Sequence, residues 1–215
     1  MRRSTLALAI LFVLLIISSC SSNPADDKPK AVTTEASPVS TPAAVASPAA
    51  PAEKYLITPE NSKIKFVASK VTRSHDGAFE KFSGTIDYTG QPETSKVTII
   101  IQTDSVTTDD PGLTKHLKTP DFFDVARYPQ ATFTSTEIKP GSNQGASHNV
   151  TGTLEMHGVT KSITFPATIT VTPEAISVDA TFSINRKDFG INYAGAADNL
   201  IRDEVVLMLQ VRATK

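Results

Sequence analysis

The residues that most often carry catalysis or bind metals are poorly placed for either task in this chain. No two histidines stand at a helical i, i+4 spacing, and the sequence contains no HExxH or CxxC motif. A GxSxG nucleophile elbow and a glycine-rich phosphate loop are also absent from the sequence. The pairs Asp26-Asp27 and Asp109-Asp110 stand in linker and loop contexts, where carboxylates are usually solvated. We therefore expect no enzymatic activity, no metal site and no cofactor; a metal or haem site assembled across strands is the alternative.

One residue has an assignable chemistry, the single cysteine Cys20. It follows Ile17-Ser18-Ser19, and small residues directly before a cysteine at the end of an apolar stretch are typical of a bacterial lipobox. Cleavage before Cys20 would leave its thiol to carry a diacylglycerol, which would anchor the protein to a membrane. Because the chain has no second cysteine, no disulfide can form within it. The alternative is a plain secretory signal with an incidental cysteine.

The residues before Cys20 have the composition of a signal peptide. Arg2 and Arg3 precede 12 uncharged apolar residues, 6–17, whereas a membrane-spanning helix needs about 20. We predict that residues 1–19 are a lipoprotein signal peptide and that the protein lies on the periplasmic side of a bacterial envelope. Ser21 rather than aspartate follows the cysteine, which favours the outer membrane by analogy with a sorting rule of some Gram-negative bacteria.

The next segment, residues 20–53, is rich in Ala, Pro, Ser and Thr. Its only larger aliphatic residues are Val32, Val39 and Val45, so it has little apolar surface to offset the entropy of ordering. We predict a disordered tether with some polyproline II character. At up to about 3 Å per residue, such a tether would hold the following domain tens of ångströms from the membrane.

Residues 54–215 have the length of one domain. Loss of Arg2 and Arg3 with the signal peptide would leave 19 Lys and Arg against 22 Asp and Glu, a net charge of −3. No basic patch appears in the sequence, which argues against nucleic acid and anionic lipid surfaces as partners. A homodimer is one oligomeric state that the sequence allows.

Within this domain, apolar residues alternate with polar ones at the period of β-strands. The clearest alternation is Ile176, Val178, Ala180, Phe182 and Ile184, and turn signals separate the alternating segments. The pattern predicts an all-β antiparallel meander with hairpin connections, in a barrel or a sandwich; the fold we expect, with the family resemblance given below, is a barrel of about eight strands. The inward side chains of such a barrel would include Phe66, Ile99, Ile101, Phe133, Leu154, Met156, Phe165, Phe182 and Leu207.

An eight-stranded barrel is either filled by its own side chains or left open for one ligand, and composition alone favours the filled core. Phe122, Phe123 and Tyr128 either close the mouth over a ligand or plug one end against a short helix predicted over 111–119. The last strand is apolar on both faces around 205–211, and we expect this helix to cover its outer face. A strand buried on both faces is the alternative, and the two interpretations do not exclude each other.

Three motifs resemble one known family. They are HLKTPDFFDVARYPQATFTST at 116–136, GTLEMHGVTKSITF at 152–165 and INRKDFGI at 184–191. Together, in this order, they are similar to the signature of the YceI-like family of bacterial periplasmic proteins, and the similarity runs from Tyr55 to the C-terminus. The resemblance implies a lipocalin-like barrel that is open and encloses a long polyisoprenoid or fatty-chain lipid. One departure is Asn61-Ser62, which stands where the family often has His-Ser, so that head-group chemistry could differ here.

The resemblance and the residues together favour a lipid-anchored, non-enzymatic periplasmic protein that stores or transports a long apolar lipid. Candidate ligands are a polyisoprenoid, a quinone precursor or a fatty amide. The eleven predicted contacts are the nine inward residues named above together with Phe122 and Phe123. Two alternatives remain: a barrel scaffold that binds an envelope protein partner, and a redox accessory protein that carries a cofactor. Arg186, Asp188 and Arg202 could recognise a lipid head group, although a network within the turn at 186–188 is the simpler interpretation.

Overall fold

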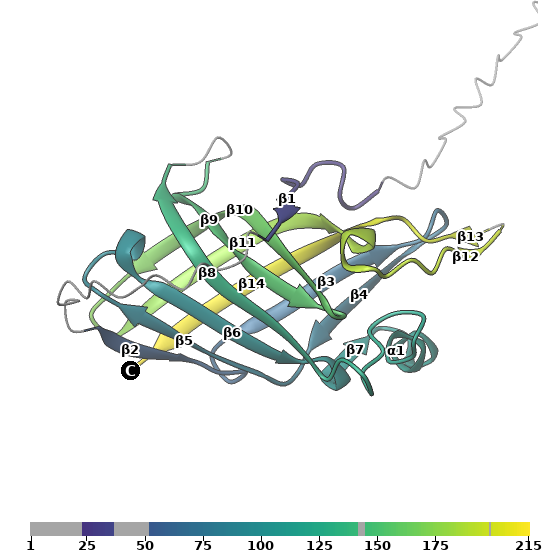
Figure 1. Cartoon of the computed structure of the whole chain (residues 1–215), viewed down its shortest axis with the longest axis horizontal. Helices are drawn as coiled ribbons and strands as arrows, with labels where there is room; N and C mark the ends of the chain where they lie inside the picture. Colours follow the sequence, from purple (N-terminus) through teal and green to yellow (C-terminus); the bar gives the residue numbers. More distant parts are fainter. Residues whose placement is uncertain (1–22, 37–51, 142–144, 198) are drawn as a thin grey trace, which may run out of the picture.

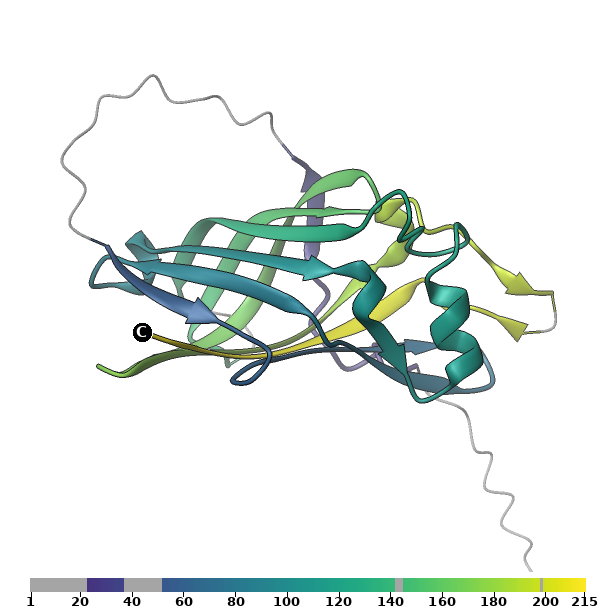
Figure 2. The same ribbon diagram turned by 90° about the horizontal axis from the view of Figure 1, so that it is seen from below.

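The computed structural model describes residues 23–36, 52–141, 145–197 and 199–215, and these fold into an elongated antiparallel barrel (Figures 1 and 2). Cys20 and the predicted signal peptide lie outside the described residues. Within the described residues, no helix is long and apolar enough to cross a membrane. The wall strands are β2 (Glu53–Ile57), β3 (Lys63–Ser69), β4 (Ser74–Phe79), β5 (Phe82–Tyr88), β6 (Lys96–Gln102), β7 (Val106–Thr108), β8 (Gln130–Pro140), β9 (His148–Met156), β10 (Val159–Val171), β11 (Ala175–Asn185) and β14 (Glu204–Thr214).

At three places around the barrel, two short strands lie end to end and together take the place of one long strand. The pairs are β2 with β3, β5 with β4, and β6 with β7. β14 pairs first with β2, at Thr214 and Leu56, and then with β3 from Gln210 to Val206. The same change of partner occurs where β5 gives way to β4 and where β6 gives way to β7. Counted by position, the described residues form the expected eight-stranded antiparallel barrel, whose strands the alternation predicted and whose closure the family resemblance implied.

Asn61 and Ser62 make the break between β2 and β3. The Asn61 Oδ1 accepts a hydrogen bond from the backbone N–H of Thr58 (3.1 Å) and another from the Ser62 hydroxyl (2.9 Å). The Ser62 hydroxyl in turn accepts from the backbone N–H of Arg212 in β14 (3.0 Å). The pair that departs from the family pattern therefore ties the interrupted strand to its neighbour.

Most of the barrel is a meander whose connections follow the expected turn chemistry. His157 and Gly158 both have positive φ, 53° and 74°, as a two-residue hairpin between β9 and β10 requires. The turn at 172–174 is closed by a hydrogen bond from the Thr172 N–H to the Ala175 carbonyl. Short 3-10 turns occupy Pro92–Thr94, Thr103–Ser105 and Arg186–Phe189, and a small hairpin of β12 (Gly195–Ala196) and β13 (Asn199–Leu200) extends beyond one end (Figure 1).

The N-terminal segment corrects the prediction of a disordered tether over 20–53. Residues 23–36 lie on the barrel, and β1 (Val32–Glu35) pairs antiparallel with β10 (Figure 1). Low hydrophobicity suggested disorder, but the edge of β10 offers this segment a ladder of backbone hydrogen bonds that composition does not reveal. The remaining tether residues that precede 52 lie outside the described residues.

The short helix forms, but it does not cover β14. α1 (Pro111–Leu117) lies against β7 at one end of the barrel, beside the β12–β13 hairpin (Figure 2). Only Asp109 and Asp110 separate β7 from the helix, so the helix must stay where β7 ends. The prediction that α1 covers the outer face of the last strand is therefore wrong.

Two glycines leave room for phenylalanine rings on the inner wall. The Phe66 ring lies over Gly77 of β4, and the Phe133 ring lies over Gly152 of β9. A β-carbon on Gly152 would contact the Phe133 ring and would stand 2.5 Å from the Thr134 carbonyl oxygen. Because the second obstacle is backbone, the site cannot absorb a methyl group by turning a side chain.

We predict that Gly152→Ala destabilises the barrel by about 1–3 kcal/mol, the usual cost of overpacking a well-packed interior. Urea unfolding followed by circular dichroism measures this change. The control is Thr153→Ala, on the outer face of the same strand, for which we expect a change within about 0.5 kcal/mol. Equal effects of the two substitutions would show that the ring does not require a glycine beneath it.

Candidate functional site

The barrel encloses an apolar cavity of about 190 Å³. One water molecule needs roughly 10–15 Å³ of such space, so the cavity far exceeds an ordinary packing defect. All eleven residues predicted to contact a ligand line it: Phe66, Ile99, Ile101, Phe122, Phe123, Phe133, Leu154, Met156, Phe165, Phe182 and Leu207. The interior is therefore open, in agreement with the family resemblance and against the filled core that composition favoured.

Further lining residues come from the same strand faces and from the loops at one end. Ile64, Val97 and Val178 share the inward face of predicted strands, so the alternation signal could have found them. Ile191 and Ile201 come from the segment between β11 and β14, where no periodic pattern marks them. Strand alternation identifies the wall of the cavity and the aromatic motif identifies Phe122 and Phe123 at its end, but neither signal marks Ile191 and Ile201.

Aromatic rings cluster on the wall of the cavity. The rings of Phe165 and Phe182 stack with centroids 4.2 Å apart, and Phe133 packs against Phe165 at 5.7 Å. A second group, toward α1, has Phe79 within 5.7 Å of Phe66 and within 5.5 Å of Phe123. Such pairs add to the area that each ring buries and hold the rings in fixed positions, which gives the cavity a defined shape.

The end of the barrel beside α1 is capped by that helix and the loop that follows it. Leu117 and Phe122 are buried there in one cluster with Phe66, Val106 and Ile191. Phe122 and Phe123 thus line the cavity and also pack under the cap, and their closure over a ligand stays a prediction. Tyr128, the third aromatic residue of the motif, instead packs against His157 and over Gly158 at the β9–β10 turn.

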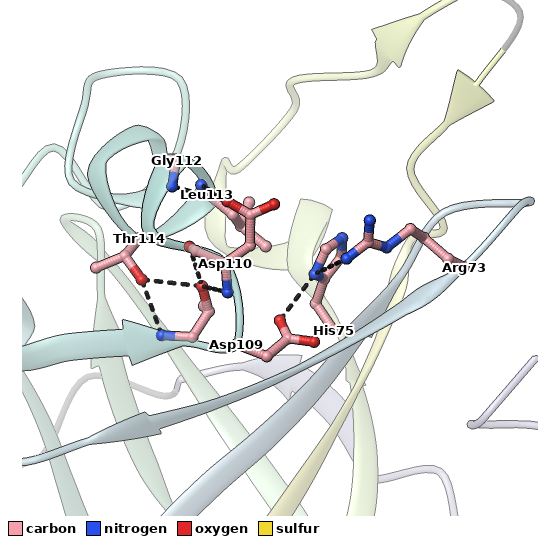
Figure 3. Close-up of polar contacts among 8 residues, drawn as sticks. Arg73, His75, Asp109, Asp110, Gly112, Leu113 and Thr114 are labelled. Atoms are coloured by element: carbon pink, nitrogen blue, oxygen red, sulfur yellow. Dashed lines mark hydrogen bonds and ion pairs between the residues drawn. The ribbon is translucent and has the colours of Figure 1, made fainter.

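A polar network fixes the cap to the wall (Figure 3). The Asp110 carboxylate accepts hydrogen bonds from the backbone N–H groups of Gly112 (2.7 Å) and Leu113 (3.1 Å), and these bonds lower the pKa of Asp110. The Thr114 hydroxyl accepts from the Thr108 N–H of β7 at 2.9 Å. Asp109 is 2.8 Å from Nδ1 of buried His75 on β4. The helix is therefore held on two neighbouring strands.

Among the described residues, Arg186 is the one charged side chain that lines the cavity, but its guanidinium binds groups of the protein itself. It is buried, and its guanidinium donates to the carbonyl oxygens of Ile191 (2.6 Å), Arg202 (3.1 Å) and Ile201 (3.4 Å) and to the carboxylate of Asp203 (3.2 Å). Burial lowers the pKa of Arg186, and Asp203 opposes that shift. Arg186 therefore binds the 191–203 segment to the end of β11 and presents its alkyl stem to the cavity.

The turn motif that contains Arg186 has a structural role, but the residue that caps the turn differs from the one expected. The Asn185 side chain, rather than Asp188, caps the 3-10 turn by accepting from the Lys187 N–H at 2.9 Å. Gly190 ends the turn in the left-handed region, with φ of 73°. The Arg186 contacts favour the network interpretation over head-group recognition for this residue.

The histidines of the described chain each contact a neighbouring group. The contacts join His75 to Asp109 (2.8 Å), His116 to Asp121 (2.8 Å), His148 to Glu93 (3.3 Å) and His157 to the Phe189 carbonyl (3.2 Å). Across the residues that the structure describes, no three His, Cys, Asp or Glu side chains gather in a way that could hold a metal ion.

The fold and cavity together define a class of protein, a closed antiparallel barrel with an apolar interior. Residues 55–213 match the model of the YceI-like domain, and the chain belongs to that family. A UPF0312 protein of Pseudomonas putida strain F1 is 36% identical over 132 residues, which is 58% of this chain and 68% of that protein.

Solved structures share the fold. BcnA of Burkholderia cenocepacia is 27% identical, with a TM-score of 0.65 over 74% of this chain and 99% of that one. A YCEI protein of Campylobacter jejuni is 28% identical, with a TM-score of 0.56 over 65% of this chain and 84% of that one. A domain from Saccharophagus degradans, described as polyisoprenoid binding, is 20% identical, with a TM-score of 0.60 over 76% and 98% of the two chains.

We predict that Arg186→Lys destabilises the protein by about 2–5 kcal/mol, because lysine cannot satisfy the carbonyl groups that the buried guanidinium fork reaches. Thermal and urea unfolding followed by circular dichroism test this expectation. The matched control is Lys187→Ala, whose exposed ion pair with Asp203 should contribute at most about 1 kcal/mol. A small loss for Arg186→Lys would show that Arg186 is not needed to hold the end of the barrel.

Proposed function

We propose that this protein is a lipid-anchored, non-catalytic protein of the bacterial envelope that holds one long apolar chain inside its barrel. The observation that carries the proposal is the 190 Å³ cavity, whose wall is apolar along the barrel and continues under the cap. Membership of the YceI-like family and the fold shared with a domain described as polyisoprenoid binding support the same ligand class. Polyisoprenoids, quinone precursors and fatty amides all have such chains.

Burial is the source of affinity in this proposal. Each methylene moved from water into the cavity contributes about 0.8 kcal/mol, so about eight methylenes contribute roughly 6 kcal/mol before the cost of ordering the chain. The cavity wall has no polar group to select among apolar chains, because the Arg186 guanidinium is occupied by carbonyl oxygens and Asp203. Selectivity would then follow chain length and shape, with any polar head group at an end of the barrel.

The anchoring part of the proposal rests on the sequence. Cleavage before Cys20 and acylation of its thiol would attach the barrel to a membrane on the periplasmic side, and Ser21 favours the outer membrane. The proposed site residues are the eleven that line the cavity and were predicted from the sequence.

Solvent extraction of the purified protein, followed by mass spectrometry, tests the ligand assignment. We expect a stoichiometric apolar lipid in the native protein. The double variant Ile99→Phe with Leu154→Phe should retain the fold and lose most of this lipid, because the added ring volume occupies the cavity. Thr98→Val, on the outer face of β6, is the control and should leave the bound lipid unchanged.

An extract with no lipid, obtained again after incubation with lipids of the native organism, would contradict the carrier proposal. It would favour the scaffold alternative, in which the barrel displays its loops to an envelope protein.

The anchoring proposal has its own test. Cys20→Ser should abolish labelling by radioactive palmitate in a bacterial host and move the protein from the membrane fraction to the soluble fraction, since several acyl chains are needed for durable attachment. Ser21→Ala is the neighbouring control and should leave labelling intact. Membrane attachment of the Cys20→Ser chain without labelling would show that another feature holds it there.

A further inference from the structure

The wall of the barrel has a seam between β10 and β11. The two strands pair from Val171 and Ile176 to Thr168 and Asp179, and there their ladder stops. Pro166, which has no N–H to donate, lies two residues further along β10. Beyond this point the backbone of β11 turns to another partner, because the Ser183 N–H donates to the Pro29 carbonyl (2.8 Å).

Residues 29–35 fill the seam. The Ala31 N–H donates to the Ser183 carbonyl at 2.8 Å on one side, and Val32–Glu35 pair with Thr164–Lys161 of β10 on the other. Ala31 is buried in the same cluster as Phe165 and Phe182, whose stacked rings bridge β10 and β11 on the cavity side. The segment therefore completes the wall at the place where the cavity is lined by these two rings.

This wall strand has few buried contacts. Of the described residues 23–36, Ala25 and Ala31 are buried, and Val32 is 63% exposed, so the segment buries little apolar surface. Ion pairs hold its two ends, Lys30 to Glu204 and Glu35 to Lys161, and exposed pairs of this kind contribute about 0–1 kcal/mol. By contrast, β11 pairs with β14 along eleven residues. Segments with few buried contacts open at a lower free energy than the global fold.

The same segment stands next to the proposed anchor. Three peptide units separate Cys20 from Asn23, the first described residue, which is about 10 Å of fully extended chain. With Cys20 in the membrane, the seam would lie on the side of the barrel nearest the bilayer. The segment between anchor and barrel is thus also the segment that closes the seam.

We propose that residues 29–35 are a removable wall strand, and that their release opens a side port between β10 and β11 through which the apolar chain passes between membrane and cavity. This inference rests on the proposed function. The strand supplies a reversible closure, because Ala31 withdraws only one small side chain from the buried cluster and the ladder to β10 re-forms when the strand returns.

A disulfide across the strand tests the port. Thr34 and Ser162 are partners in the β1–β10 ladder, and antiparallel partners lie within disulfide range. The full chain carrying T34C and S162C is purified, stripped of lipid and reconstituted in phosphatidylcholine vesicles. Exchange of cis-parinaric acid, a fluorescent fatty acid, should be at least about tenfold slower in the oxidised protein than after reduction with dithiothreitol, because the strand can then leave only with β10.

The control is T134C with T153C, a pair that joins β8 to β9 in the uninterrupted wall. Its oxidation should leave the exchange rate unchanged. Equal rates for the oxidised and reduced T34C/S162C protein, in a protein that binds the fatty acid, would overturn the side port while the proposed function stands. A protein that binds the fatty acid in no state would overturn the proposed function itself.

Hydrogen exchange tests release of the strand without any ligand. The amides of Ala31 and Ser183 should exchange faster than those of the β11–β14 ladder, and oxidation of T34C/S162C should slow them. Exchange at these two amides that is as slow as in the β11–β14 ladder would overturn the inference whatever the barrel binds.

Discussion

Closure of the sheet through β14 is the constraint on which the rest of the structure depends. β14 pairs along eleven residues with β11 on one edge and with β2 and β3 on the other. Closure pairs the backbone groups that an open edge would expose, and it fixes the interior at the width of eight strands. Phenylalanine rings over Gly77 and Gly152 narrow that interior without filling it. The width of the cavity is therefore set by the closed wall and by the phenylalanine rings that lie over Gly77 and Gly152.

The sequence predicted the wall well because strand faces are periodic. Alternation placed Phe66, Ile99 and Leu154 on the inner face, and the structure shows all three at the cavity. The ends of the barrel were less predictable, since Arg186 contacts the backbone carbonyls of residues 5 to 16 positions away, and such carbonyls carry no side-chain signature. Composition also could not predict whether the barrel interior is open or filled, because this depends on small differences in packing between the assembled strands.

The N-terminal segment shows why composition can mislead. Residues 23–36 have the polar, proline-containing character of a linker, and that character predicted disorder. What orders them is a vacant ladder on β10 and the Ser183 backbone on β11, so the information lies in the partner strands rather than in the segment. Ala31 is the one apolar residue of β1 and its preceding turn that joins the buried cluster of Phe165 and Phe182 within the described residues.

The docked segment also sets the length of chain between the proposed anchor at Cys20 and the barrel. With residues 23–35 on the barrel, an anchored protein has about 10 Å of free chain and works at the surface of its own membrane. When the segment detaches, the chain between Cys20 and β2 at Glu53 loses its fixed point on the barrel, so the distance between anchor and barrel can increase. Under the side-port proposal, the motion that opens the barrel therefore also enlarges the volume it can search, so loading and reach would change together.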